Sequence, residues 1–151
     1  MTELERIGDQ LKRALEGPAW HGPALLEVLD GVTAAQAAQR PLSQAHSIWE
    51  IVLHISVWED VVRRRALAER VEITPEQDWP KVTDTGSAAW RRAVEALSTS
   101  NQALRDVVAA FDVRRLDQPL VPRGNTAYVQ FHGAVQHDLY HAGQIAVLRK
   151  G

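Results

Sequence analysis

One stretch near the end of the chain decides the fold, and it reads GAVQHDLYHAGQI from Gly133 to Ile145. We expect it to lie within a helix that runs from about Thr126 to the C-terminus. His137 and His141 are four residues apart, so both imidazoles lie on one face of this helix, about one turn apart, together with core aliphatic residues. Two imidazoles in this arrangement can bind one metal ion. The stretch therefore predicts a long helix and part of a metal site.

The face of this helix opposite the histidines is also mostly apolar. Its polar stripe is narrow and contains only Gln136, Gly143 and Lys150, so the helix is apolar nearly all round. Such a helix needs cover on two sides. We therefore predict a homodimer that forms through this helix.

The rest of the chain shows the same helical spacing of apolar residues, interrupted by capping signals, glycines and prolines. We expect helical segments from the N-terminus to about residue 17 and over residues 23–29, 33–39, 43–70 and 87–111. No segment shows the alternation with period two that is typical of strands, and no internal repeat is present. The sequence therefore predicts an all-α protein.

Residues 71–86 contain Pro75, Pro80 and Gly86 and show no clear periodicity. This segment is too long for a tight hairpin between helices, so we expect it to cross the bundle. A chain of 151 residues is one ordinary domain. We therefore predict a four-helix bundle with a long crossover between its second and third long helices.

The composition excludes several classes of protein. A formal net charge of -2 lacks the basic excess that phosphate neutralisation requires, so we expect no nucleic-acid partner. The arginine run at residues 63–65 lies among acidic residues, and we interpret it as a solvated helix face. No stretch approaches the ~20 apolar residues of a membrane span and no signal core is present, so we expect a cytoplasmic protein without a membrane partner. The absence of cysteine excludes disulfides, thiolate ligands and a cysteine nucleophile.

His54 is the best candidate for a third metal ligand among the six histidines of the chain. In the helix over residues 43–70, polar and charged residues recur at three- and four-residue steps and form a stripe that we expect to face solvent. The members of this stripe are Ser56, Glu59, Asp60, Arg63 and Arg64. His54 lies on the opposite face and therefore points inward.

Three imidazoles in an apolar core leave polar nitrogens that need partners. Each histidine alone is more simply an ordinary core or surface residue, but one metal ion satisfies all three together. His54, His137 and His141 would form a facial site that keeps positions open for water or substrate, as catalytic rather than structural metals do. We predict one divalent transition-metal ion, and such a site accepts zinc, nickel, cobalt, copper or iron.

The order His137-Asp138-x-x-His141 also resembles the His-Glu-x-x-His motif of zinc proteases, in which the acid is the general base. Aspartate is one methylene shorter than glutamate, and no further histidine or acid follows among the last ten residues. The sequence therefore does not favour a protease. We interpret Asp138 as a neighbour of the metal ligands or as a helix-surface residue.

Three more side chains are candidates for the surroundings of the metal. Glu50 lies one turn before His54 and could orient an imidazole or accept a proton, although a solvated carboxylate near a helix start is an equal alternative. Trp58 lies beside His54 and is a candidate substrate wall. His132 is about 100° from His137 around the helix, so we interpret it as a pocket residue and a poor ligand. The sequence does not identify a catalytic residue.

These residues resemble the DinB-like (DinB/YfiT) family of metal-binding four-helix bundles. The resemblance is carried by AWHGP at residues 19–23, SIWEIVLHI at 47–55 and GAVQHDLYHAGQI at 133–145, in the family order over essentially the whole chain. It implies a single DinB-like domain over residues 1–151, two parallel middle helices linked by a long crossover, and often a homodimer. It also implies that His54, His137 and His141 bind nickel, zinc or another divalent ion.

Relatives in this family include metal-dependent transferases that use low-molecular-weight thiols, a maleylpyruvate isomerase and hydrolase-like members. The chain has no recognisable thiol-binding segment and departs from the thiol transferases on that point. The resemblance implies a metal-dependent transferase or hydrolase that acts on a small-molecule substrate, with or without such a thiol. The alternative is a noncatalytic metal- or ligand-binding dimer of the stress response. An open metal position facing a cleft would favour the enzyme, and a site without an adjoining pocket would favour the alternative.

Overall fold

The helices begin where the sequence supplies capping residues. The computed structural model describes residues 1–151, and its elements are α1 (Glu3–Glu16), α2 (Leu25–Leu29), α3 (Ala34–Ala38), α4 (Ile48–Ala66), α5 (Pro75–Asp78), α6 (Ser87–Ala110), a short 3-10 helix (Val113–Arg115) and α7 (Ala127–Leu148). At the start of α4, the Ser47 hydroxyl accepts a hydrogen bond from the Glu50 backbone N–H at 3.2 Å. The Glu50 carboxylate in turn accepts one from the Ser47 backbone N–H at 2.8 Å. These bonds satisfy N–H groups that have no partner inside the helix.

The second long helix is shorter than predicted, and the crossover contains a helix that the sequence pattern does not reveal. α4 begins after Ser47 rather than near residue 43, because the capping box fixes its first turn. It ends at Ala66, because Ala68 takes a left-handed conformation with a φ of 64° and turns the chain away from the helix axis. The short helix α5 lies inside the crossover.

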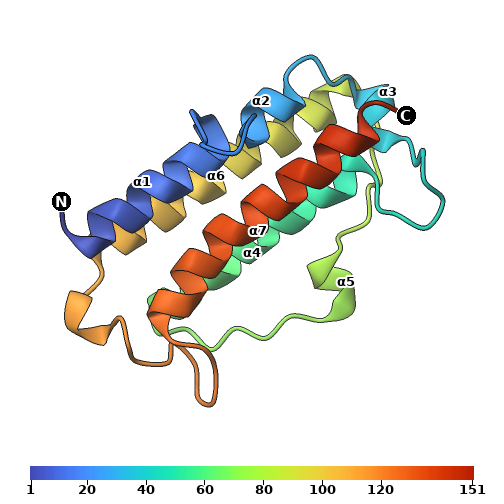
Figure 1. Cartoon of the computed structure of the whole chain (residues 1–151). Helices are drawn as coiled ribbons and strands as arrows, with labels where there is room; N and C mark the ends of the chain where they lie inside the picture. The colour runs from blue at the N-terminus through green and yellow to red at the C-terminus, as the bar shows by residue number, and fades with distance from the viewer.

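Four long helices, α1, α4, α6 and α7, form the bundle (Figure 1). α6 packs against α1 and α4, and α7 packs against the same two helices. α1 and α7 run in one direction and α4 and α6 in the other, because the crossover of residues 67–86 returns the chain to the end where α4 began. The predicted all-α four-helix bundle with its long crossover is therefore confirmed. None of its helices is long and apolar enough to cross a membrane.

The apolar core is in two parts. One cluster fills the end of the bundle that contains α2 and α3, and a second cluster fills the opposite end. Between the two lies a band of buried polar side chains from α4, α6 and α7, which we call the polar band. It consists of His54, Glu59, Asn101, Asp138 and His141. Because buried polar groups cost free energy unless they are paired, the polar band indicates where function lies.

Glu59 corrects the sequence interpretation of α4. Its side chain is predicted to face solvent with the charged stripe, but it is only 1% exposed. α4 packs against α6 on one side and α7 on another, so its neighbours cover a wider arc of the helix than a single apolar stripe. The other members of the stripe are partly exposed.

Candidate metal centre

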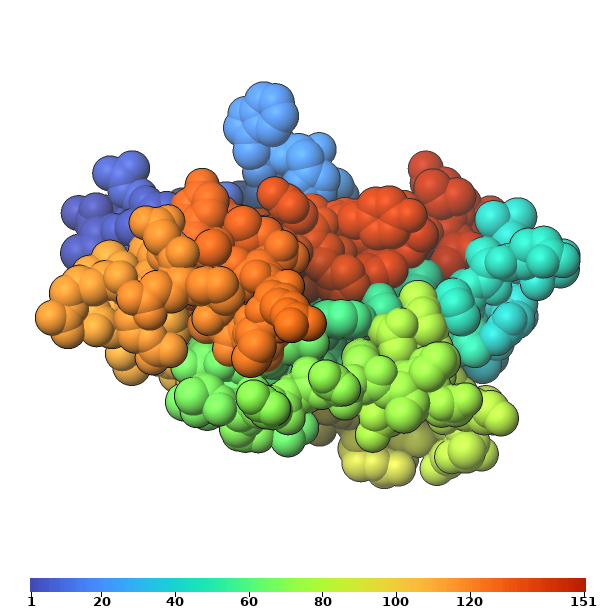
Figure 2. Space-filling model, turned by 90° about the horizontal axis from the view of Figure 1, so that it is seen from below, coloured from blue at the N-terminus to red at the C-terminus, as the bar shows by residue number.

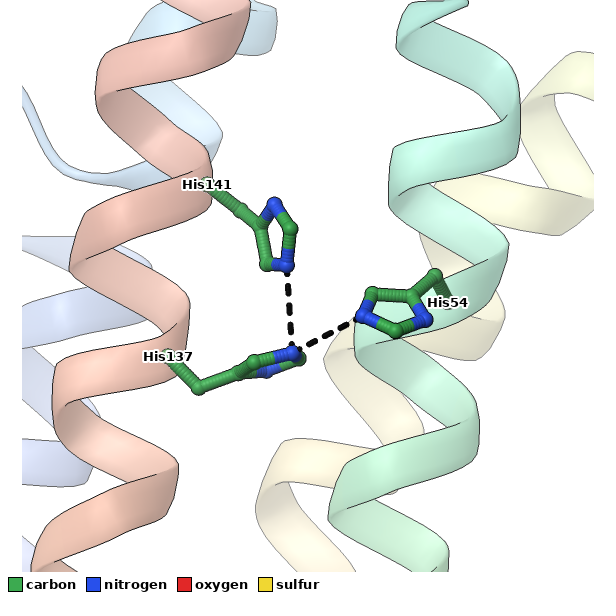
Figure 3. Close-up of side chains that lie close together, drawn as sticks. All are labelled: His54, His137 and His141. Carbon is green, nitrogen blue, oxygen red and sulfur yellow. Dashed lines mark hydrogen bonds between the residues drawn. The ribbon is translucent and has the colours of Figure 1, made fainter. Parts of the chain in front are cut away.

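Three imidazoles meet at the polar band, two that belong to it and that of the half-buried His137. His54 comes from α4, and His137 and His141 come from successive turns of α7, which runs antiparallel to α4. Their side chains point toward one another (Figure 3). The Nε2 atom of His137 lies 3.0 Å from Nε2 of His54 and 3.1 Å from Nε2 of His141. All three ligand atoms lie within 4.8 Å of one another, so the structure brings the three predicted ligands together.

The outer ring nitrogens of two of these histidines already have acceptors. Nδ1 of His54 lies 2.8 Å from the backbone oxygen of Asp78 and 3.0 Å from its carboxylate. Nδ1 of His141 lies 2.6 Å from the side-chain oxygen of Gln144. An acceptor at Nδ1 places the ring proton there, which leaves a lone pair on Nε2. The Nε2 atoms of His54 and His141 are therefore both prepared to bind a cation.

The geometry fits a metal ion. Neutral His137 carries at most one proton on Nε2, so it cannot satisfy two lone pairs at once by hydrogen bonding. Zinc–nitrogen distances are about 2.0–2.1 Å, which places two ligands about 3.0 Å apart at a right angle and about 3.3 Å apart at a tetrahedral angle. The observed separations of 3.0 and 3.1 Å agree with these values. The donor set and these two separations are consistent with a three-histidine metal site.

Burial keeps two of the imidazoles neutral. Burial, together with the neighbouring His141 and His54, lowers the pKa of His137 to about 3. Burial also lowers the pKa of His141, although its hydrogen bond to Gln144 opposes the shift. Only a neutral imidazole binds a metal, so both residues are available as ligands at neutral pH.

This lowered pKa makes a pH-dependent contribution to stability. Since folded His137 resists protonation until far below the ordinary pKa of 6.5, its contribution is present above pH 6.5 and is lost as the pH falls toward 3. We expect metal-free wild type to lose free energy of unfolding, relative to His137→Gln, as the pH is lowered from 7.5 to 4.5. Urea unfolding of both proteins across this range measures the difference. A difference that stays constant with pH would contradict the prediction, and His132→Gln is the matched control.

The crossover holds His54 in place. The Asp78 carboxylate that faces His54 also accepts a hydrogen bond from the indole N–H of Trp58 at 2.7 Å. The Trp79 ring stacks on His54 with the ring centroids 3.8 Å apart and on His46 with the centroids 3.5 Å apart. Asp78 and Trp79 are not among the site residues predicted from the sequence, because their stretch lacks periodicity. Only the contact between the crossover and α4 reveals their role.

Removing the Asp78 carboxylate is expected to weaken metal binding. Groups that orient a metal-bound histidine typically change metal affinity by about 10- to 100-fold, and the Asp78 backbone oxygen remains in Asp78→Ala. We therefore expect a loss near the lower figure, about tenfold, measured by competition with a zinc chelator. Glu76→Ala, which alters an exposed residue of the same short helix, is expected to bind zinc as wild type does. Equal affinities for Asp78→Ala and wild type would show that the carboxylate does not orient His54.

The other predicted site residues lie at different distances from this centre. Glu50 caps α4 with Ser47 and forms an ion pair with Arg40, so its carboxylate is engaged away from His54. His132 lies 3.5 Å from a carboxylate oxygen of Glu3 and packs against Tyr128, away from the three ligands.

Trp58 and Asp138 lie closer to the ligands. The Trp58 ring is 6.3 Å from that of His137, measured between centroids. Asp138 is fully buried beside Glu59 and makes no hydrogen bond to an imidazole. Both side chains line a cavity that also reaches His137.

Two cavities flank the three histidines. The first, of about 700 Å³, is lined by His141 together with Trp79 and Tyr140, and we call it the His141 cavity. The second, of about 530 Å³, is lined by His137 and Trp58 and extends toward the start of α7; we call it the His137 cavity. Both volumes are in the range of small-molecule sites. In the space-filling view, a strip of α4 (green) is visible between the crossover (lime green) and α7 (orange to red) (Figure 2).

Two buried carboxyl groups complete the polar band. Glu59 accepts hydrogen bonds from the Ser100 hydroxyl and, at 2.7 Å, from the Asn101 amide, whereas neither oxygen of Asp138 has a hydrogen-bond donor. Burial raises the pKa of Glu59 to about 7, against the effect of these bonds. Burial and the adjacent Glu59 also raise the pKa of Asp138 well above its ordinary value. The pair therefore resists ionisation of both groups.

Comparison with known proteins gives one match. The model of a protein family described as the DinB superfamily matches residues 19–145, a range that contains all three histidines and most of the bundle. Searches of curated proteins and of solved structures found no match.

Proposed function

The chain belongs to the DinB superfamily, and on that premise we propose that it is a metal-dependent enzyme of the thiol-transferase or hydrolase type. The residues that would hold the ion are His54, His137 and His141, and nickel or zinc is the ion that we propose. When bound, such an ion acts as a Lewis acid and lowers the pKa of a water or thiol that it coordinates. The chain has no cysteine, so a thiol nucleophile would come from a low-molecular-weight cosubstrate.

One observation carries this proposal: a cavity of substrate size adjoins His141, and another adjoins His137. A metal site with a purely binding role needs no such space, and three protein ligands leave further coordination positions open. Asp78 and Gln144 fix the orientation of two imidazoles, and the Trp79 ring covers one face of the His54 imidazole. The arrangement supports the enzyme over the noncatalytic metal-binding dimer.

An activity screen tests the proposal. Protein loaded with zinc or with nickel is incubated with a panel of low-molecular-weight thiols plus an electrophile, and separately with a panel of small esters. We expect turnover of at least one class by loaded wild type, and none by metal-free protein or by His54→Ala. A fully loaded protein that turns over neither class would contradict the proposal and favour the noncatalytic alternative.

A homodimer through α7 is also part of the proposal. Large apolar side chains are exposed along this helix, and they are Tyr128, Val129, Tyr140 and Val147. Tyr140 and Val147 are 66% and 64% exposed and border the His141 cavity, so an interface here would lie beside the metal centre. Light scattering across a hundredfold range of concentration is expected to give the mass of a dimer, and Val147→Glu that of a monomer. A monomer mass for wild type at every concentration would remove the dimer.

A further inference from the structure

The arginine run of α4 contains one side chain that differs from its neighbours. Arg63 forms an ion pair with Asp60 at 2.6 Å, and Arg64 forms one with Glu69 at 2.7 Å, as expected of a solvated helix face. Arg65 has no carboxylate partner. It is half-buried and lines the His137 cavity. The solvated helix face predicted for this run therefore describes the two ion-paired arginines, whereas Arg65, which is partly exposed like them, lines the His137 cavity.

The guanidinium of Arg65 is held in place but is not saturated. Nε and Nη2 donate to the backbone oxygen of Val71 at 3.3 and 3.1 Å, and Nη1 donates to the side-chain oxygen of Gln130 at 3.4 Å. Gln130 is itself buried and donates to the backbone oxygen of Asn125 at 3.1 Å. Since a guanidinium has five N–H groups, one on each terminal nitrogen remains free. Two such parallel N–H groups match the two oxygens of a carboxylate.

The lining of the cavity carries one positive charge that no exposed carboxylate neutralises. Arg65 is the only arginine or lysine in its lining. Glu59 and Asp138 also border the cavity, but they are 1% and 0% exposed and face the core, so they present almost no surface to a ligand.

The N-terminus of α7 adds no anion site. The backbone N–H groups of Ala127, Tyr128 and Val129 already donate to the oxygens of Gln118, Leu116 and Thr126. The cavity therefore offers a phosphate dianion only one cation and no free helix terminus. The single charge and two oxygens of a carboxylate correspond to the single charge and two free N–H groups of Arg65.

The distance between the two ends of the cavity sets the shape of the ligand. Arg65 and His137 line the two ends of the cavity, and these are at most about 12 Å apart, because the Trp58 ring lies 6.3 Å from the His137 ring and 5.8 Å from the Arg65 guanidinium. Trp58 and Val62 line the cavity between them. The cavity therefore joins an imidazole end to a cationic end along an apolar wall.

We infer that the His137 cavity binds an elongated substrate that carries a carboxylate, with Arg65 as the group that receives it. The reacting end of this substrate lies toward His137, and this placement rests on the metal centre of the proposed function. Arg65 then determines specificity by selecting acids over neutral molecules of the same shape.

The test uses two probes that differ only in their end group, hexanoate and 1-hexanol, added to metal-free protein at pH 7.5. Binding is followed by the NMR signal of the Trp58 indole N–H, because Trp58 lines the cavity. A carboxylate accepts charge-assisted hydrogen bonds from the guanidinium that a hydroxyl does not match, so we expect hexanoate to bind about tenfold more tightly than 1-hexanol. In Arg65→Gln this preference is expected to disappear while 1-hexanol binding is retained. Arg64→Gln, which removes the neighbouring exposed arginine, is expected to keep the preference.

Equal affinities of wild type for hexanoate and 1-hexanol would overturn the inference without reference to any variant. A preference for hexanoate that survives in Arg65→Gln would overturn it as well. Because the protein is metal-free, the result does not depend on whether the three histidines bind an ion. Failure of the metal site is measured separately, by metal analysis, so the two outcomes are distinguishable.

Discussion

Replacing His137 with alanine is expected to abolish metal binding. Wild type loaded with zinc and desalted is expected to contain close to one ion per chain, and His137→Ala close to none. His137 occupies the middle of the donor set, because its Nε2 atom is the one that lies within 3.1 Å of both other ligand atoms. Its loss leaves only His54 on α4 and His141 on α7 as ligands. Zinc sites use three or four protein ligands, so two imidazoles are not expected to hold the ion through desalting. Elemental analysis of the desalted proteins gives the stoichiometry.

His132→Ala is the matched control for this experiment. His132 lies on the same helix, is about one-third exposed and is close to Glu3 rather than to the other histidines. We expect it to retain the wild-type stoichiometry. Circular dichroism of both variants checks that α7 is intact, and the removal of a half-buried, uncharged imidazole is expected to leave the helix content unchanged. An unchanged zinc content in His137→Ala would refute the three-histidine site.

The part of the site that the sequence predicts is the part determined by local helical geometry. His137 and His141 share a face of α7 because they are four residues apart, and His54 points inward because of its position on α4. The family resemblance identified the same three residues. The antiparallel contact between α4 and α7 then brings their Nε2 atoms together.

The part that the sequence does not predict depends on contacts between segments that are far apart in the chain. Asp78 and Trp79 come from an aperiodic crossover, so no spacing rule connects them to His54, 24 residues earlier. Glu59 follows the spacing of a solvent-facing stripe, yet α6 covers it and supplies two hydrogen-bond donors. Arg65 looks like part of an ordinary basic run, and only the fold shows that it lines a cavity. In each case the role of the side chain depends on a contact with a residue that is far away in the sequence.

Asp138→Asn is expected to stabilise the protein at pH 8. In the folded chain the carboxyl groups of Glu59 and Asp138 are buried together, and both pKa values are raised, that of Glu59 to about 7. Unfolded, both groups ionise near pH 4. A carboxyl group whose pKa is raised by folding contributes stability below its unfolded pKa, and this contribution is lost as the pH rises through the folded pKa. At pH 8 wild type therefore carries the cost of placing negative charge in the polar band.

The asparagine side chain removes the Asp138 carboxyl group, which the folded chain keeps protonated at a raised pKa, and places an amide beside the Glu59 carboxylate. Because an unsatisfied buried polar group costs about 1–3 kcal/mol, we expect the free energy of unfolding at pH 8 to increase by an amount in this range. The gain is expected to shrink as the pH falls toward 5, where wild type holds protons on the pair. Urea unfolding of metal-free protein at pH 5, 6.5 and 8 measures it. Asp106→Asn, an exposed change on α6, is expected to stay within about 0.5 kcal/mol of wild type at each pH.

The opposite result would be equally informative about the polar band. If Asp138→Asn were less stable than wild type at pH 8, the Asp138 carboxylate would have to be ionised and stabilised by a donor in the folded protein. Metal analysis of the same variant tests whether the carboxyl pair of Glu59 and Asp138 affects metal binding by the three imidazoles. Asp138 makes no hydrogen bond to His137 or His141, so we expect Asp138→Asn to bind one zinc ion per chain. Stability and metal content would then change independently, as expected if the carboxyl pair and the three imidazoles adjoin without sharing a hydrogen bond.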